Sequence, residues 1–307
     1  MEDIIQHLFR EIQALRHTVE LAERYFPLSS RGIIEAMLRR RGFLEIKYPP
    51  GDDLLLPQKH TQKAKDALYH LMRKYSFRIF ARDLITHIDD IATEHLTRYC
   101  SEEVAQNYLA TLMQHRILRQ TQEGTYQFPN QHVINFGETL EWFVAQVIER
   151  EFASPAVWGA CFKHKDISGD YDVLCAVEGR LTYIEVKSSP PKHIEMSEVI
   201  AFMNRVQHLR PDVAIFLEDT HLRMKDKLAG LFTEEMRRRY GSLAEKDLSV
   251  QRLHDEIFTI QRRLFITNTK PDLISNLRIC LKHALAGIEL SEPKSGFLKK
   301  PDFFHVN

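Results

Sequence analysis

Two apolar runs joined by a tight turn constrain the fold of this chain more than any other feature. Residues 171–177 read YDVLCAV, residues 181–186 read LTYIEV, and Glu178-Gly179-Arg180 lies between them. Short runs rich in β-branched and aromatic residues, separated by a glycine turn, predict an antiparallel β-hairpin with both faces buried. The hairpin also places charged residues within segments that otherwise belong to a core.

The charges of this hairpin are Asp172, Glu185 and Lys187. A two-residue turn sets Asp172 opposite Glu185 or opposite Lys187, and residues two apart on one strand share a face. All three side chains are therefore expected at one end of one face. Burying an unpaired charge costs several kcal/mol, so the three must either satisfy one another or bind something at that end.

The chemistry of this set indicates a metal ion and a phosphate. Two clustered carboxylates repel one another unless a cation lies between them, and ligation by oxygen alone favours Mg²⁺ or Mn²⁺ over zinc. A protonated lysine cannot ligate a metal, but it can hold a metal-bound water and offset the charge of a phosphate. The set therefore predicts metal-assisted attack of water on a phosphodiester.

The spacing of these residues resembles the PD-(D/E)xK signature of restriction-endonuclease-like nucleases. Asp172 followed by Glu185-Val186-Lys187 is similar to the signature, and Tyr171 stands where the signature has proline. The resemblance implies that Asp172, Glu185 and Lys187 are catalytic. It also implies that Asp172, Glu185 and Val186 hold Mg²⁺ or Mn²⁺.

The same resemblance implies a further catalytic glutamate on the helix before the hairpin. Gly137 and Glu141 match the Gly-x-x-x-Glu context that members use, and Glu138 is the substitute one helical turn earlier. The resemblance covers about residues 136–217, with helix, three strands, helix and strand in the family's order. A second Glu-x-Lys, at residues 45–47, lacks the preceding aspartate and the acidic helix, so it is not expected to form a site.

The domain that holds the hairpin is predicted to be residues 131–307. Helices and apolar strands alternate there, which predicts an α/β domain with a mixed sheet flanked by helices. Strands are expected at 156–162, 171–177, 181–186, 213–217 and 263–267, and helices at 136–152, 195–209, 222–240 and 273–286.

Two mostly helical, winged-helix-like units are predicted before this domain, at residues 1–58 and 59–130. The first has an amphipathic helix, a second helix and two strand-like pieces around a Pro-Pro-Gly turn. The second predicts helices at 63–74, 81–91 and 102–114 and then a short hairpin, an outline that resembles a winged-helix domain. Its last helix has Glu102 and Glu103 and no Lys or Arg, so both DNA and a protein partner remain open as its target.

Composition excludes several classes of protein. The chain has 42 Lys+Arg and 42 Asp+Glu, so its net charge gives no signal for nucleic acid. The four cysteines have no zinc-site spacing, and no apolar run approaches the ~18 residues that span a bilayer. The first segment begins with acids and does not read as a signal peptide. We therefore expect a cytoplasmic protein with no membrane partner.

These features predict a metal-dependent DNA endonuclease with winged-helix modules for targeting or regulation, and RNA is not excluded as the substrate. The alternative is a catalytically silent nucleic-acid-binding or scaffold protein on a nuclease fold. Two basic groups are candidate phosphate contacts: Lys163 and Lys165 before the hairpin, and Arg237, Arg238 and Arg239 within helix 222–240. A solvated helix face is the other interpretation of the three arginines.

We also expect a homodimer, because cutting both strands of a duplex needs two sites or two sequential events. The candidate surfaces are the uncharged third-helix face of residues 59–130 and an apolar tail, which folds back on its own domain in the alternative. The tail contains Phe297, Leu298, Phe303 and Phe304. Finally, replacing either clustered carboxylate should relieve repulsion and leave stability level or raise it.

Overall fold

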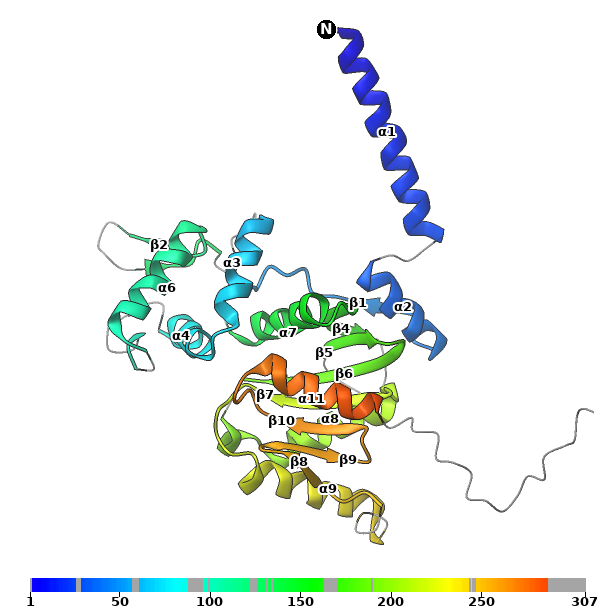
Figure 1. The fold of residues 1–307 in the computed structure, drawn as a ribbon, viewed down its shortest axis with the longest axis vertical. Coiled ribbons are helices and arrows are strands. Elements are labelled where there is room, and N and C mark those ends of the chain that lie inside the picture. The colour runs from blue at the N-terminus through cyan, green and yellow to red at the C-terminus, as the bar shows by residue number, and fades with distance from the viewer. Residues whose placement is uncertain are drawn as a thin grey trace, which may run out of the picture.

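The computed structural model describes one body with a long helix beside it (Figure 1). A mixed sheet lies between two layers of helices, and a helical unit with a small sheet packs beside it. This arrangement confirms the predicted α/β class. The described residues are 2–25, 29–56, 61–87, 96–98, 100–121, 126–130, 132–133, 135–162, 170–188, 190–242, 244 and 247–286.

In the described residues the large sheet has eight strands, in the order β1-β4-β5-β6-β7-β10-β9-β8. β6 pairs with β7 and β7 with β10 in parallel, and the other neighbours pair antiparallel. The bounds are β1 Ile46–Lys47, β4 Ala156–Phe162, β5 Tyr171–Val177, β6 Arg180–Lys187, β7 Val213–Glu218, β8 Gln251–His254, β9 Ile257–Ile260 and β10 Leu264–Thr267.

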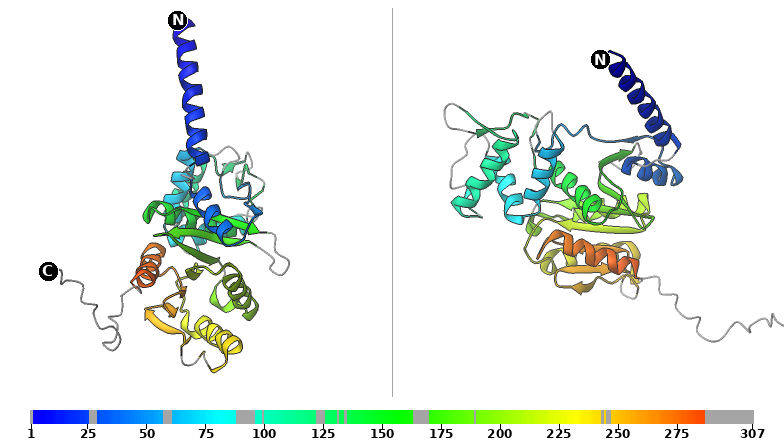
Figure 2. Two further views of the ribbon diagram at one scale, coloured as in Figure 1. Left: turned by 90° about the vertical axis from the view of Figure 1, so that its right-hand side faces the viewer. Right: turned by 45° about the horizontal axis from the view of Figure 1, so that its top comes forward.

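Helices cover both faces of this sheet (Figure 2). α7 (Gly137–Glu151) and α11 (Leu273–Leu285) pack on one face. The other face carries α2 (Ser30–Arg40), α8 (Met196–Leu209) and α9 (Gly230–Tyr240). From Val173 to Val177, successive residues of β5 serve the two layers in turn, as the period of two in a strand requires. Because both faces are covered, β5 and β6 read as continuous apolar runs.

The β5–β6 hairpin forms as the sequence predicted. Glu178 and Gly179 both have positive φ, 47° and 74°, which is the backbone of a type I′ turn. The pairing runs from Val177 opposite Arg180 to Val173 opposite Ile184. The pairing ends there, and Asp172 instead accepts a hydrogen bond from the backbone N–H of Val186.

The strand-like pieces of residues 1–58 do not form the expected hairpin. β1 instead adds to the edge of the large sheet, with Ile46 opposite Phe162 of β4. Gly159 of β4 makes this possible, because it has a φ of 62° and a Cβ there would lie 2.6 Å from Cγ of Pro49. Leu54, Leu55 and Leu56 pack in the same core as α7. Residues 29–56 are thus built into the α/β body.

A strand pair that the sequence did not predict, β8 and β9, extends the opposite edge of the sheet. β9 pairs with β10, and β8 pairs with β9. β8 is an outer strand of mostly exposed polar residues, so it lacks the apolar signal on which strand prediction depends.

The helical unit of residues 59–130 follows the predicted order. α3 (Gln62–Met72), α4 (Tyr75–Thr86) and α6 (Glu102–Gln114) precede a two-stranded sheet of β2 (Arg119–Gln120) and β3 (Tyr126–Gln127). α4 begins at Tyr75, before the predicted start at residue 81, since Phe77 and Phe80 already belong to its buried face. The core of this unit is continuous with the core between α7 and the sheet.

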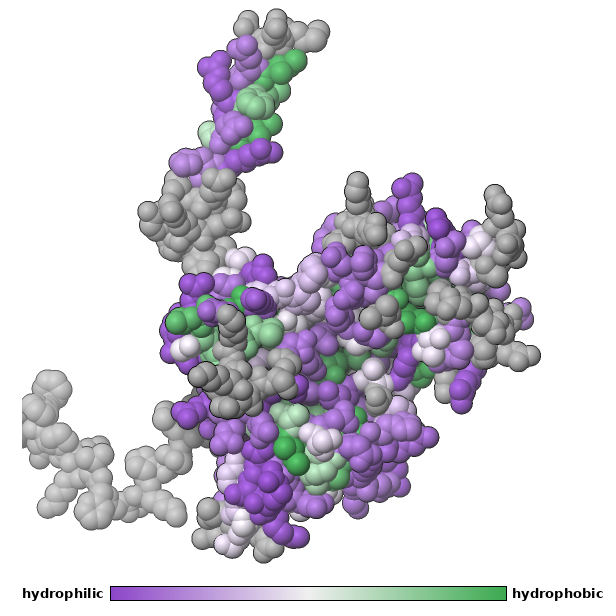
Figure 3. Space-filling view, turned by 180° about the vertical axis from the view of Figure 1, so that it is seen from behind, coloured by the Kyte–Doolittle hydropathy of each residue, from purple (hydrophilic) through white to green (hydrophobic). Residues whose placement is uncertain are grey.

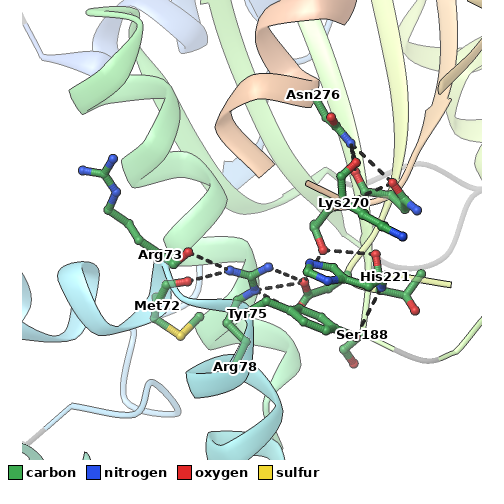
Figure 4. A network of polar contacts seen from close by, with 12 residues as sticks. Met72, Arg73, Tyr75, Arg78, Ser188, His221, Lys270 and Asn276 are labelled. Carbon is green, nitrogen blue, oxygen red and sulfur yellow. Dashed lines mark hydrogen bonds and ion pairs between the residues drawn. The ribbon is translucent and has the colours of Figure 1, made fainter. Parts of the chain in front are cut away.

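A buried ion pair joins the helical unit to the sheet (Figure 4). Nη2 of Arg78, in α4, lies 2.8 Å from Oδ1 of Asp219, just beyond β7, and their side chains are 2% and 0% exposed. Nη1 of Arg78 also donates to the carbonyl of Met72 at 2.7 Å. Beside this pair, the ring of Tyr75 stacks on His221 with centroids 3.7 Å apart. The helical unit is therefore fixed to the strand ends by satisfied charges as well as by apolar packing.

The remaining long helix, α1 (Glu2–Tyr25), projects from the body in every view (Figures 1 and 2). Across the described part of the chain, no helix has the length and hydrophobicity required to cross a membrane.

Replacing Arg78 with alanine should lower the free energy of unfolding by about 3–5 kcal/mol, because Asp219 would stay buried without a counter-charge. Urea unfolding measures this loss. Arg73→Ala is the control, since Arg73 is 45% exposed and pairs with Glu151 at 3.4 Å, an exposed pair worth about 1 kcal/mol or less. Equal losses for the two variants would contradict the role given to Arg78.

Candidate active site

The four predicted catalytic residues come from three neighbouring elements. α7 supplies Glu141, β5 supplies Asp172, and β6 supplies Glu185 and Lys187. α7 packs across β4, β5 and β6. Charge effects on the pKa of Glu141 come from Asp172 and Glu185, so the structure brings the acids of all three elements within electrostatic reach of one another.

Glu185 is fully buried and completely hydrogen-bonded. Oε1 lies 2.7 Å from Nζ of Lys187, and Nη1 of Arg205 donates to both carboxylate oxygens at 3.1 Å. The hydroxyl of Tyr183 donates to Oε2. A carboxylate has about four lone-pair positions, and these contacts occupy all of them. Glu185 is thus an anion that the protein's own cations neutralise.

Arg205 is a partner of Glu185 that the sequence analysis missed. It lies in α8, which covers the sheet face that carries Tyr183, two residues before Glu185 on β6. Its Nε–H is buried and donates to no acceptor among the described residues. The sequence does single out this residue, because Arg205 is the one Lys or Arg in α8.

Asp172 has a different environment from Glu185. The backbone N–H of Val186 donates to its Oδ2 at 2.7 Å, and no other described residue hydrogen-bonds to the carboxylate. Burial and the Glu185 charge raise the pKa of Asp172 well above the usual range, while Lys187 lowers it less strongly. The protein therefore leaves the negative charge of Asp172 largely uncompensated.

The two candidate helix acids, Glu138 and Glu141, have different electrostatic surroundings. Burial first and the charge of Asp172 second raise the pKa of Glu141, whose Oε2 is buried without a hydrogen-bond partner among the described residues. For Glu138 the main causes are burial and then Asp53. Of the two glutamates, Glu141 is therefore the one whose pKa the charge of Asp172 raises.

The part of the site that could hold a divalent cation is the side of Asp172 and Glu141. Both carboxylates offer oxygens that accept no hydrogen bond, and Val186 could offer only its backbone carbonyl. Glu185 could join a metal only by exchanging one of its present partners. In the described residues no group of three or more His, Cys, Asp or Glu side chains is already arranged around a metal position. The donor chemistry thus fits a hard cation, with two carboxylates and a carbonyl as its protein ligands.

Glu218 is a further buried acid next to the site. It ends β7, where it pairs with Lys187 across the parallel ladder. Neither of its carboxylate oxygens receives a hydrogen bond from a described residue. Burial, followed by the charges of Glu198 and Asp219, raises the pKa of Glu218 to about 8. Glu218 is therefore a second acid, after Asp172, whose negative charge would lack a partner at this end of the sheet.

The three arginines predicted to contact phosphates differ in their contacts and exposure. Arg239 joins two helices, because it pairs with Glu235 in its own helix and donates to Asn204 of α8 at 2.6 Å. Arg238 is paired with the same Glu235 at 2.7 Å but is largely exposed. The side chain of Arg237 is exposed too. Arg239 thus links α9 to α8, and the phosphate contact stays a prediction. Lys163 and Lys165 lie outside the described residues.

No protein-family model matches this sequence, and no curated protein matches it either. Among solved structures, the fold is similar to protein VC1899 from Vibrio cholerae, at 14% identity and a TM-score of 0.47, over 82% of this chain and 62% of that one. It is also similar to Can2 from Sulfobacillus thermosulfidooxidans in complex with cyclic tetra-adenylate, at 12% identity and a TM-score of 0.43, over 84% of this chain and 61% of that one. This chain spans less than two thirds of either protein. Likenesses at this level assign neither family nor function.

Glu218 should make the metal-free protein less stable as the pH rises. An unfolded glutamate titrates near pH 4.5, whereas folded Glu218 keeps its proton to about pH 8. Between these values unfolding releases a proton, so the contribution of Glu218 to the free energy of unfolding falls as the pH rises. This contribution is lost above about pH 8. Glu218→Gln should flatten the decline of the thermal midpoint across this window. An unchanged slope in this variant would show that Glu218 is not a buried neutral acid.

Removing the two clustered carboxylates of the hairpin should have opposite effects on stability. Glu185→Ala should cost about 3–5 kcal/mol, because it leaves Arg205 and Lys187 close together without their anion. Asp172→Asn should leave stability level or raise it, because it removes a charge that burial and Glu185 disfavour. The structure thus corrects the expectation for Glu185 and retains it for Asp172. Urea unfolding of both variants checks this, and equal costs would contradict the division of the site into satisfied and unsatisfied acids.

Proposed function

We propose that this chain is a metal-dependent nuclease of the PD-(D/E)xK type, acting as a DNA endonuclease. The observation that carries the proposal is the convergence of Glu141, Asp172, Glu185 and Lys187 from α7, β5 and β6. A hairpin with a structural Glu–Lys pair would need neither the uncompensated Asp172 nor the unpartnered oxygen of Glu141. Neighbouring buried acids that raise one another's pKa are typical of functional sites.

The order of elements around the site supports the same proposal. Helix α7, strands β4, β5 and β6, helix α8 and strand β7 follow one another along the chain. This is the helix, three strands, helix and strand expected of a restriction-endonuclease-like domain. We assign it to residues 131–307, with α2 and β1 of residues 1–58 added to its edge. Residues 59–130 are proposed to be the winged-helix domain.

The chain's own residues would each have a distinct role. Burial lowers the pKa of Lys187, but Glu185 and Asp172 outweigh burial and raise it, so Lys187 stays an ammonium ion. As a cation with its stem fixed in β6, it can orient the attacking water and offset charge on the phosphate. Arg205 holds Glu185 in place from α8. Mg²⁺ or Mn²⁺ at Asp172, Glu141 and the Val186 carbonyl would supply the Lewis acid that polarises the phosphate.

The winged-helix unit is proposed to contact a protein and not DNA through α6. Its exposed first turn carries Glu102 and Glu103, and no Lys or Arg follows in the helix. A helix of this charge is poorly suited to phosphates. The neighbouring helix α4 is bound to the α/β body. Its Arg78 pairs with Asp219, and its Arg82 donates to the carbonyl of Ser188, the residue after Lys187.

The carboxylate of Glu185 has all its hydrogen-bonding positions filled by protein groups, and this favours a second candidate function. With Arg205, Lys187 and Tyr183 already bound to it, Glu185 resembles a structural ion cluster as much as a metal ligand. A catalytically silent nucleic-acid-binding or scaffold protein would retain this cluster.

A cleavage assay separates the two. Supercoiled plasmid, single-stranded DNA and RNA are each incubated with the protein and Mg²⁺ or Mn²⁺. We expect cutting of DNA that Lys187→Ala, Asp172→Asn and Glu185→Gln each reduce by at least about 100-fold, the range for losing a group that stabilises transition-state charge. Glu141→Gln should be comparable or weaker. Lys192→Ala, an exposed lysine five residues further on, is the matched control and should cut normally.

The outcomes assign the function. Cutting of RNA alone would change the substrate but keep the mechanism. DNA binding without cutting under either metal would support the silent protein. Full activity of Asp172→Asn or Lys187→Ala would reject the proposed site.

A further inference from the structure

α1 is a long helix whose apolar side chains are not covered by the body. It runs 24 residues and projects away from the sheet. Figure 3 shows its apolar residues along one side of the helix. These side chains are about half or more exposed: Ile5 62%, Leu8 54%, Ile12 48% and Leu15 63%. A helix with such a stripe is stable in water only when another surface covers the stripe.

The spacing of the stripe identifies the kind of surface that covers it. Ile5, Leu8, Ile12 and Leu15 are separated by three, four and three residues, and the sequence continues the alternation at Val19 and Ala22. This is the a/d repeat of a coiled coil, in which two positions in seven form a narrow seam.

We propose that α1 pairs with α1 of a second copy of this chain in a parallel, two-stranded coiled coil. Ile5 and Ile12 occupy a positions, and Leu8 and Leu15 occupy d positions. β-branched residues at a with leucine at d favour two parallel strands over three or four. The partner is therefore a second α1 in the same direction.

The residues beside the seam complement one another in the parallel arrangement. Position g of one helix lies against position e of the next heptad in the other. Glu11 at g then faces Arg16 at e of the second copy, an attractive pair. Ile4 at g faces Phe9 at e, and both are strongly exposed in one chain, at 65% and 63%. An antiparallel pair would set Phe9 against Arg16 and leave Glu11 without a cation.

This interface replaces the dimer surfaces that the sequence first indicated. The third helix of residues 59–130 is not needed for it, and the tail with Phe297 and Phe304 lies outside the described residues. The dimer does not depend on the reaction. Its consequence does rest on the proposed nuclease function: a parallel pair brings both bodies to the same end of the coil, so that two sites can act on the two strands of one duplex.

The test is the mass of the full-length chain in solution by light scattering at micromolar concentration. We expect about twice the 36.0 kDa of one chain. Ile12→Asp should weaken the dimer by about 100-fold or more, because each helix loses a buried isoleucine and gains a charge. Gln13→Asp, at the next residue but outside the seam, is the matched control and should stay dimeric. Urea unfolding should show that neither change alters the body.

Two further variants test the register and the direction. Glu11→Arg should weaken the dimer, and adding Arg16→Glu should restore it. Leu8→Cys should crosslink to itself under oxidation, in a Cys161→Ser background that removes the exposed native thiol. A monomeric wild-type chain, a dimer that Ile12→Asp leaves intact, a trimer or larger assembly, or no crosslink at residue 8 would each overturn the proposal. None of these results depends on whether the protein cuts nucleic acid.

Discussion

The buried carboxylate of Glu185 is the constraint around which the α/β body is organised. A charge at the centre of a sheet is tolerated only with partners of opposite charge and good geometry. Arg205 reaches it from α8 and Lys187 from the same strand, so the charge fixes the position of α8 over the sheet. The aromatic side chains of β5, β6 and α8, among them Tyr171, Tyr183 and Phe202, then fill the space below.

The helical unit of residues 59–130 is attached to the same strand ends that carry the site. Arg78 binds Asp219, which follows Glu218 of β7, and Arg82 binds the carbonyl of Ser188, which follows Lys187 of β6. Because buried ion pairs demand a fixed geometry, this attachment holds α4 in one position relative to β6 and β7. The unit is thus part of the framework that supports the ends of these strands, whatever it binds elsewhere.

The sequence was sufficient for features that depend on local pattern. The hairpin and its turn follow from strand periodicity and a glycine at positive φ. Features made by contacts between distant segments were missed. Arg205 pairs with Glu185 across two elements, β1 joins β4 rather than its neighbour in sequence, and Arg239 bonds to another helix, since tertiary packing decides each of them. β8 was missed for the opposite reason, because an exposed edge strand needs no apolar pattern.

The acids at the end of the hairpin divide into two groups with different physical meaning. Glu185 is neutralised by cations of the protein, and removing it would expose those cations. Asp172 and Glu141 are buried near one another and near Glu185 with no such compensation, so each raises the free energy of the other's charged form. Folding alone gains nothing from that arrangement, because an asparagine or glutamine in either place would avoid the repulsion. The repulsion between Asp172 and Glu141 is therefore a cost that the packing of the body does not offset.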